Sequence, residues 1–311
     1  MRLVFCGTPQ FAVPTFHALL DAGHTIALAL VQPDRAAGRG LEVRTPPVKQ
    51  SALARGIPVV QPEKLRQNPE LERQLRDIAP EAIIVVAYGR IIPPWMLALP
   101  PYGNLNLHGS LLPKYRGAAP IQWAIAQGET ETGVTTMRLD EGLDTGDILL
   151  QSRVVVGPQQ TAGDLYPVLA SVGAALMVET LAGLADHSVK AMPQDNTQAT
   201  LAPILTREDG RIDWNRSAFE IFNRWRGFYP WPGAFTNLRG RKLVLHAMRT
   251  VEDQSVSARP GTLRRDLGRV LVVCGNGSLL ELLEVQMEGK RRTPAADFLN
   301  GYRLSADEQL G

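Results

Sequence analysis

The chain has 311 residues, 44% apolar and 21% charged, which fits a globular protein with room for two domains rather than a disordered chain. We find no apolar run of the roughly 20 residues that span a bilayer, and the opening segment before Gly7 is too short for a signal peptide. Cys6 and Cys274 suggest neither a disulfide framework nor a zinc site. We therefore expect a cytoplasmic protein that makes no membrane contact and is a monomer by default.

The net charge of +2 is unevenly distributed along the chain. Residues 1–206 carry 16 basic and 18 acidic side chains, whereas residues 207–311 carry 17 and 13. The excess is greatest between Arg224 and Arg269, which hold ten basic residues, nine of them arginine, against three acidic ones. Such a stripe is often only a solvated face, but beside an acidic half it favours a polyanionic partner.

Short apolar runs alternate with helical segments in the first part of the chain. Strands are predicted at 3–6, 26–31 and 82–87. Helix starts are predicted at Thr8-Pro9, Thr45-Pro46 and Asn68-Pro69, because proline suits the first helical position. This alternation predicts a doubly wound, mostly parallel sheet. The segments that follow its strands, 7–10, 32–40, 87–92 and 108–113, should then meet at one crevice.

The rest of the chain predicts two further features. Strands at 134–139 and 148–156 flank a glycine-rich loop, and a capping segment at 161–164 starts a helix that runs to about Ala185. Beyond a connector poor in apolar residues, short apolar runs predict a small β domain, an OB-like β-barrel. We therefore expect a Rossmann-like α/β domain over residues 1–190, a linker over 191–207 and a β domain over 208–311.

The segment from Asn104 to Pro113 carries the clearest chemical signal. Its alternation of polar and apolar residues is that of a strand, which places Asn106 and His108 on one face, about 6.5 to 7 Å apart. A lone histidine is more commonly a core residue, but an amide beside it and a break at Gly109 indicate an active-site edge. Asp144, between two glycines, adds a carboxylate. Together the three supply an oxyanion donor, a proton carrier and a group that orients it.

Other kinds of site fit the sequence less well. The turn at 7–10 lacks the GxGxxG spacing, and Pro9 removes a backbone donor, so we expect no nucleotide cofactor. The carboxylates around Asp144 lack the spacing of a calcium loop, and no metal is expected. Ser110 has no base in its own motif and Cys6 is predicted to be buried, which favours direct transfer between two substrates over a covalent intermediate.

These motifs resemble those of the folate-dependent formyltransferase family. Asn106-x-His108-x-Ser110-Leu111-Leu112-Pro113 and the later Asp144-Thr145-Gly146-Asp147 are similar to its motif pair, over roughly residues 1–190. The loop from Pro33 to Lys49 and the segment from Trp225 to Ala234 are similar to those of the member that acts on an aminoacylated tRNA. With both, the resemblance extends over nearly the whole chain.

The resemblance implies formyl transfer from 10-formyltetrahydrofolate to the α-amine of initiator methionyl-tRNA through a tetrahedral oxyanion intermediate. Asn106 and His108 would donate hydrogen bonds to the oxyanion, and Asp144 would take up or relay the amine proton. Folate would lie along two loops and contact Tyr88, Arg90, Ile92, Ser110, Leu111, Leu112 and Pro113. The tRNA would contact a set of basic residues, of which Arg39 is the one singled out. The set is Arg35, Arg39, Arg44, Lys49, Arg224, Arg226, Arg241 and Lys242.

Two alternatives stay open. A formyltransferase for a small amine, such as glycinamide ribonucleotide or an amino sugar, would share the Asn-His-Asp set without needing a basic second domain. A folate- or RNA-binding module without catalysis would leave the coexistence of the three polar residues unexplained. The aromatic cluster at Trp225, Phe228, Tyr229 and Trp231 fits packing at a domain boundary better than a base-stacking platform.

Overall fold

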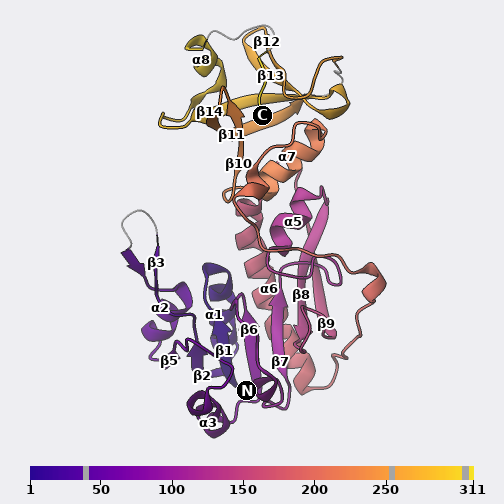
Figure 1. The fold of residues 1–311 in the computed structure, drawn as a ribbon. Coiled ribbons are helices and arrows are strands. Elements are labelled where there is room, and N and C mark those ends of the chain that lie inside the picture. The colour runs from indigo at the N-terminus through magenta and orange to yellow at the C-terminus, as the bar shows by residue number, and fades with distance from the viewer. Residues whose placement is uncertain (38–41, 252–255, 303–307) are drawn as a thin grey trace. The chain divides into compact units, whose positions relative to one another are not determined.

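Two β-sheets organise the chain, which divides into two units (Figure 1). Unit 1 comprises residues 1–120, 131–155 and 165–203, and unit 2 comprises residues 121–130, 156–164 and 204–311. The structure is a computed structural model that describes residues 1–37, 42–251, 256–302 and 308–311, with the backbone alone at 35–37, 42 and 43. The domain and linker boundaries expected from the sequence stay predictions.

The sheet of unit 1 has the strand order β5-β2-β1-β6-β7-β8-β9. Its first five members pair in parallel, while β8 and β9 pair antiparallel at one edge. The strands are β1 (Arg2–Gly7), β2 (Thr25–Leu30), β5 (Val59–Val60), β6 (Ala82–Val86), β7 (Asn104–His108), β8 (Glu131–Arg138) and β9 (Ile148–Val155). The order reverses between β1 and β6, and sheets of this kind bind ligands at the carboxyl ends of the strands beside such a point. The predicted mostly parallel sheet is confirmed.

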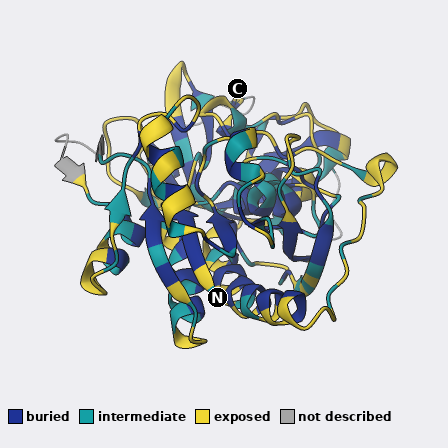
Figure 2. Cartoon of the chain, turned by 90° about the horizontal axis from the view of Figure 1, so that it is seen from below, coloured by how far each residue is buried: buried dark blue, intermediate teal, exposed yellow. Residues whose placement is uncertain are grey.

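Helices cover both faces of this sheet, and its central strands are buried along most of their length (Figure 2). The helices are α1 (Val13–Asp21), α2 (Pro47–Ala54), α3 (Pro69–Ile78), α4 (Pro94–Leu97) and α6 (Ala162–Ala185), whose first turn belongs to unit 2. On one face, Val4 of β1 shares a core cluster with Leu75 of α3 and Met96 of α4. On the other, Phe5 of β1 meets Phe16 of α1 edge to face, with 5.2 Å between ring centroids.

The predicted helix starts differ in their outcome. Asn68 caps α3 as expected, because its side-chain oxygen accepts a hydrogen bond from the backbone N–H of Leu71 at 3.1 Å. The start at Thr8-Pro9 is wrong: a 3-10 turn over Gln10–Ala12 comes first and α1 begins at Val13. The Thr8 hydroxyl instead accepts from the backbone N–H of Gln32, at the end of the neighbouring strand, at 3.2 Å.

Helix α6 is long and apolar enough to cross a bilayer by length and composition. A buried core helix passes the same test, and α6 makes the contacts of one. The hydroxyl of Thr180 lies 2.7 Å from that of Thr136 on β8. A Cβ on Gly173 would lie 2.6 Å from a methyl carbon of Leu107 on β7, so glycine leaves room for the sheet to approach.

The loop that follows β2 forms a hairpin of β3 (Arg35–Ala37) and β4 (Glu42–Arg44). Arg39 lies outside the described residues, and for Arg35 only the backbone is described. Their predicted contacts with tRNA therefore stay predictions.

Unit 2 is built on an antiparallel sheet in the order β10-β11-β14-β13-β12, with β15 paired to β14. Its strands are β10 (Ala234–Leu238), β11 (Arg241–Val251), β12 (Leu263–Asp266), β13 (Arg269–Val273), β14 (Leu279–Met287) and β15 (Thr293–Pro294). Its helices are α5 (Pro120–Ala126), of which Pro120 lies in unit 1, α7 (Ala218–Gly227) and α8 (Ala295–Asn300), and 3-10 turns occur at 196–198 in unit 1 and at 208–210 and 275–277 here. The predicted small β domain is confirmed.

The last residues connect the two edges of this sheet. Leu310 forms an antiparallel bridge with Leu238 of β10, and Gln309 forms one with Thr262, just before β12. Single bridges rather than a full strand make this connection, so the OB-like barrel itself stays a prediction.

Candidate active site

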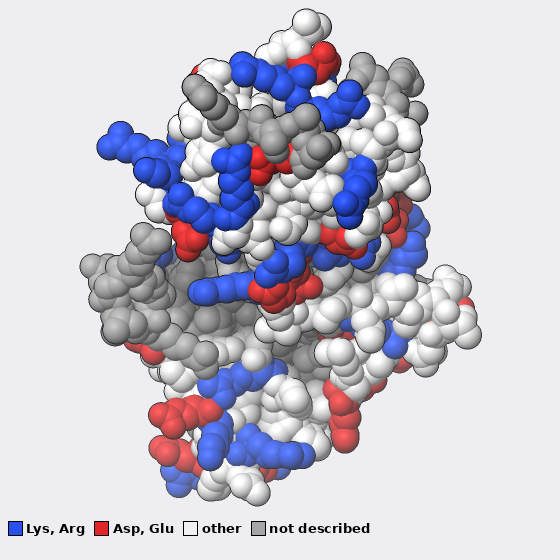
Figure 3. Space-filling view, turned by 45° about the horizontal axis from the view of Figure 1, so that its top comes forward, with Lys and Arg blue, Asp and Glu red and all other residues white. Residues whose placement is uncertain are grey.

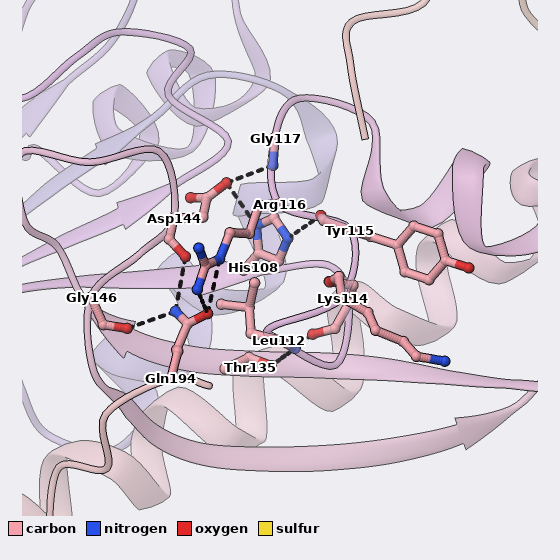
Figure 4. Close-up of polar contacts among 11 residues, drawn as sticks. His108, Leu112, Lys114, Tyr115, Arg116, Gly117, Thr135, Asp144, Gly146 and Gln194 are labelled. Carbon is pink, nitrogen blue, oxygen red and sulfur yellow. Dashed lines mark hydrogen bonds and ion pairs between the residues drawn. The ribbon is translucent and has the colours of Figure 1, made fainter. Parts of the chain in front are cut away.

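The imidazole and the carboxylate singled out in the sequence lie side by side in unit 1 (Figure 4). His108 is the last residue of β7, and Asp144 lies in the loop between β8 and β9. Nδ1 of His108 is 3.6 Å from Oδ2 of Asp144, with the two side chains 5% and 14% exposed. Strand alternation places Asn106 on the same face of β7 as His108.

Two polar neighbours hold the ring of His108 in place. Nε2 lies 2.9 Å from the backbone carbonyl of Tyr115, which can only accept, so Nε2 carries a hydrogen. Nδ1 faces the carboxylate of Asp144, which also accepts. Because 3.6 Å exceeds hydrogen-bond length, Nδ1 makes no hydrogen bond with the carboxylate and remains available to a ligand oxygen.

A glycine holds the carboxylate of Asp144 in place. The backbone N–H of Gly117 donates to Oδ2 at 2.8 Å. Gly117 has φ of +124°, and a Cβ there would lie 2.6 Å from the carbonyl oxygen of Ala202. Only glycine therefore fits at the position from which this N–H reaches the carboxylate.

The backbone around Asp144 is held by residues that the sequence did not point to. The side-chain amide of Gln194 donates to the carbonyls of Asp144 and Gly146, at 2.8 and 2.7 Å (Figure 4). Its oxygen accepts from Arg116, which is buried. No local pattern marks Gln194, because it lies in the segment expected to be a plain linker.

The other carboxylates of this loop do not form a metal site. Asp140 accepts hydrogen bonds from the backbone of Gly142 and the hydroxyl of Thr145, which fold the loop on itself. Within the part of the chain that the structure describes, no three His, Cys, Asp or Glu side chains gather as metal ligands do.

Asn106 differs from its neighbour Asn104 in what its side chain contacts. The amide of Asn104 donates to the carbonyls of Met96 and Leu97 on α4, at 2.9 and 3.1 Å, and the residue is buried. Asn106 is only partly buried, and its side chain makes no hydrogen bond with a described residue. Of the two asparagines, Asn106 therefore has the amide available to a ligand.

The loop after β6 offers backbone groups rather than side chains. The amide of Gln32 donates to the carbonyls of Tyr88 and Gly89, at 2.7 and 3.2 Å, which fixes the start of the loop. The backbones of Arg90 and Ile92 make no hydrogen bond with described residues, and the Arg90 guanidinium donates to a nearby backbone carbonyl. The Tyr88 ring is buried, which raises the pKa of its hydroxyl.

The loop at 110–113 is held mainly by its own contacts. The hydroxyl of Ser110 donates to the carbonyl of Lys114 at 2.7 Å, and the backbone N–H of Leu112 donates to the hydroxyl of Thr135 at 3.1 Å. Ser110 and Leu112 are buried, so their side chains support the loop, and their predicted contacts with folate stay predictions. Leu111 and Pro113 are partly exposed.

The predicted tRNA-binding residues of unit 1 differ in availability. Arg44 is exposed. Lys49 instead pairs with Asp34 at 2.6 Å and donates to the side-chain oxygen of Gln61 at 2.7 Å. The amide of Gln61 also donates to Asp34 at 2.7 Å, and the hydrogen bonds from Lys49 and Gln61 lower the pKa of the Asp34 carboxyl. Lys49 thus holds the base of the hairpin.

The predicted tRNA-binding residues of unit 2 are partly exposed and partly packed or buried. Arg241 and Lys242 are exposed on β11. Figure 3 shows basic side chains spread over one face of the molecule, with acidic ones between them. Arg224 stacks over Phe228, 4.8 Å from the ring centroid. Arg226 is buried and donates to two backbone carbonyls at 3.0 and 3.1 Å, and burial lowers its pKa. Arg226 is therefore a structural residue, which corrects its expected role as a phosphate contact.

The aromatic cluster lies mostly inside unit 2. Phe228 is buried, and Trp225 packs against Phe222 and Tyr229, with 5.5 and 6.1 Å between ring centroids. Trp231 is 53% exposed. Packing within unit 2 accounts for Phe228 and Trp225, and a place of the cluster at the domain boundary stays a prediction.

Comparisons with known proteins agree with this geometry. The family described as "Formyl transferase" matches residues 1–181, and "Formyl transferase, C-terminal domain" matches residues 204–303. A methionyl-tRNA formyltransferase of Acidobacterium capsulatum is 64% identical over 311 residues, covering all of both chains. One from Koribacter versatilis is 56% identical and covers all of this chain and 99% of its own.

Solved structures of lower identity share the fold. WlaRD, a sugar 3N-formyl transferase solved with dTDP and 5-N-formyl-THF, has a TM-score of 0.67 at 19% identity and covers 94% of this chain and 99% of its own. HypX from Aquifex aeolicus, in complex with tetrahydrofolic acid, has a TM-score of 0.62 at 17% identity and covers 99% of this chain and 48% of its own.

Proposed function

The chain belongs to the formyl transferase family, and we propose that it transfers a formyl group from 10-formyltetrahydrofolate to the α-amine of methionyl-tRNA. The product is N-formylmethionyl-tRNA, which serves translation initiation. The observation that carries the proposal at the site is the placement of His108, whose Nδ1 faces the carboxylate of Asp144 while Nε2 is held by a carbonyl.

Asn106 and His108 stabilise the charge that develops in the reaction. When the amine nitrogen bonds to the formyl carbon, the formyl oxygen becomes an oxyanion. The amide of Asn106 and the Nδ1–H of His108 donate to this oxygen from one face of β7. Each such donor typically contributes about 3 to 4 kcal/mol to the transition state.

Asp144 takes up the proton of the reaction and gives it back. It accepts the proton that the amine loses as the new nitrogen–carbon bond forms. It returns this proton to the donor nitrogen of the folate as the old nitrogen–carbon bond breaks, so the reaction is a direct transfer with no covalent enzyme intermediate. The carboxylate also faces Nδ1 of His108, at 3.6 Å.

The folate and tRNA sites use groups that are available on the same structure. The backbones of Arg90 and Ile92, which bond to no described residue, suit the edge of a flat heterocycle after β6. The exposed Arg241 and Lys242 of unit 2 and Arg44 of unit 1 suit phosphates of the tRNA. The enzyme works as a cytoplasmic monomer without membrane contact.

The decisive assay measures formyl transfer from 10-formyltetrahydrofolate to charged initiator tRNA, with glycinamide ribonucleotide and an amino sugar as alternative acceptors. We expect the tRNA alone to be formylated. Formylation of a small amine with none of the tRNA would favour the alternative function.

Replacing Asn106 by alanine tests the role of its amide. We expect kcat to fall about 10²-fold to 10³-fold, since one oxyanion donor is lost, with an unchanged melting temperature because the side chain bonds to no described residue. Asn104→Ala is the matched control. It removes two hydrogen bonds to α4, so it should lower the melting temperature more than kcat. His108→Ala should also lower turnover without preventing folding. Parental turnover in Asn106→Ala would remove this amide from the mechanism.

A further inference from the structure

The segment expected to be a linker forms part of the frame of the active site. Met192 exchanges two backbone hydrogen bonds of 2.8 Å with Ile148, at the start of β9. Arg116 donates its backbone N–H to the carbonyl of Thr200 at 2.8 Å and accepts from Ala202 at 2.7 Å. The segment therefore joins the loop that carries Asp144 to the loop that carries the N–H of Gly117.

Within this segment, one side chain links the two loops directly. Both N–H groups of the Gln194 amide are used, on the carbonyls of Asp144 and Gly146. Its oxygen accepts two hydrogen bonds from the Arg116 guanidinium, at 3.1 and 2.7 Å (Figure 4). Nη2 of Arg116 also donates to the side-chain oxygen of Asn196, at 2.8 Å. The Gln194 amide is thus fully satisfied and can adopt one orientation only.

The backbone of Asp144 has a conformation that needs support from its surroundings. Asp144 has φ of +51°, a left-handed conformation that residues with a side chain adopt rarely. Such conformations persist where surrounding contacts over-determine them, and they cluster at active sites. From this conformation the carboxylate of Asp144 faces His108, at a separation of 3.6 Å.

Resting on the proposed function, we propose that Gln194 is a positioning residue for the reaction, oriented by Arg116. It holds the backbone of Asp144 so that the carboxylate faces Nδ1 of His108. Gln194 is not a catalytic residue, since its hydrogen bonds go to the protein's own backbone and to Arg116.

Two substitutions in the full-length chain test this role. Gln194→Met keeps the length of the side chain and removes both donors. Gln194→Glu keeps the acceptor for Arg116 but sets a carboxylate oxygen against the two carbonyls of the Asp144 loop. Asn196→Ala is the matched control, because it removes a neighbouring Arg116 contact without touching that loop. Formylation of methionyl-tRNA is measured as kcat, KM and the pH profile of kcat, together with the melting temperature.

We expect both Gln194 variants to lower kcat at least tenfold and to shift the pH profile, with KM for the tRNA within twofold of the parent. Asn196→Ala should stay within twofold of the parent in kcat, with an unshifted profile. Turnover of the Gln194 variants within twofold of the parent, or a loss that follows the melting temperature with an unshifted pH profile, would overturn the positioning role. If Gln194→Met does not fold, Gln194→Glu decides by the same criteria. A parent chain that fails to formylate methionyl-tRNA would refute the proposed function instead.

Discussion

The substitution Asp144→Asn removes the negative charge of the carboxylate but keeps the size and shape of the side chain. The Gly117 N–H can still donate to the oxygen of the new side chain. That oxygen takes the place of Oδ2, which also faces Nδ1 of His108. The variant keeps this contact but loses the negative charge, and with it the group that takes up the proton of the amine.

The size of the effect follows from the separation of the two groups. At the 3.6 Å between Nδ1 and Oδ2, and with an effective dielectric constant of about 20, unit charges attract by about 4.6 kcal/mol. A loss of about 1.4 kcal/mol in transition-state stabilisation slows a reaction tenfold. We therefore expect Asp144→Asn to lower kcat by about 10³-fold. The melting temperature should change little, since the hydrogen bond from Gly117 is kept.

The assay is formyl transfer to methionyl-tRNA with both substrates saturating, alongside thermal unfolding and the ¹⁵N spectrum of the His108 ring. Asp147→Asn is the matched control, because this carboxylate lies in the same loop and bonds to no described residue. We expect the control to keep parental turnover. Turnover of Asp144→Asn within tenfold of the parent, or an equal loss in Asp147→Asn, would refute the role given to this charge.

Two further predictions concern unit 2. Burial alone would raise the pKa of Glu281, but hydrogen bonds from Arg269 and Arg249 outweigh burial and lower the pKa. A lowered pKa stabilises the fold at pH values above the pKa of the unfolded chain, and this gain is lost as pH falls, so Glu281→Gln should destabilise by about 1.5 to 3 kcal/mol at pH 7 and by progressively less below about pH 4. An equal loss of stability at both pH values in calorimetry would contradict this. Arg226→Ala should lower the melting temperature without altering the salt dependence of tRNA binding. Arg241→Ala should instead reduce the slope of log affinity against log salt concentration by about one, at unchanged stability. The reverse pattern would contradict the assignment of Arg226 to the core.

Much of the fold was predictable because it depends on local patterns. The apolar runs that became β1 and β6 are buried on both faces, and Asn68 caps its helix through a bond three residues away. The start of α1 was not predictable, because the hydroxyl of Thr8 bonds to Gln32, which comes 24 residues later. A local rule cannot tell which of two partners a side chain will take.

The residues of the site likewise divide into those that local patterns predict and those that they do not. Asn106 and His108 stand out because strand alternation puts two polar groups on one face, and Asp144 stood out through its glycines and the family motif. Gln194 carries no such mark, since its role depends on a segment that returns to the loop some 50 residues earlier in the chain. Charge patterning likewise predicted Arg226 as a phosphate contact, because a count of arginines does not distinguish a buried one from an exposed one.

The bridges made by Gln309 and Leu310 bear on how unit 2 is produced. Until these two residues are in place, β10 and the start of β12 have no partner along these edges, and open edges are sites of aggregation. The folding domain is therefore exposed to self-association until Gln309 and Leu310 have paired. Removing residues 308–311 would make that vulnerable state permanent.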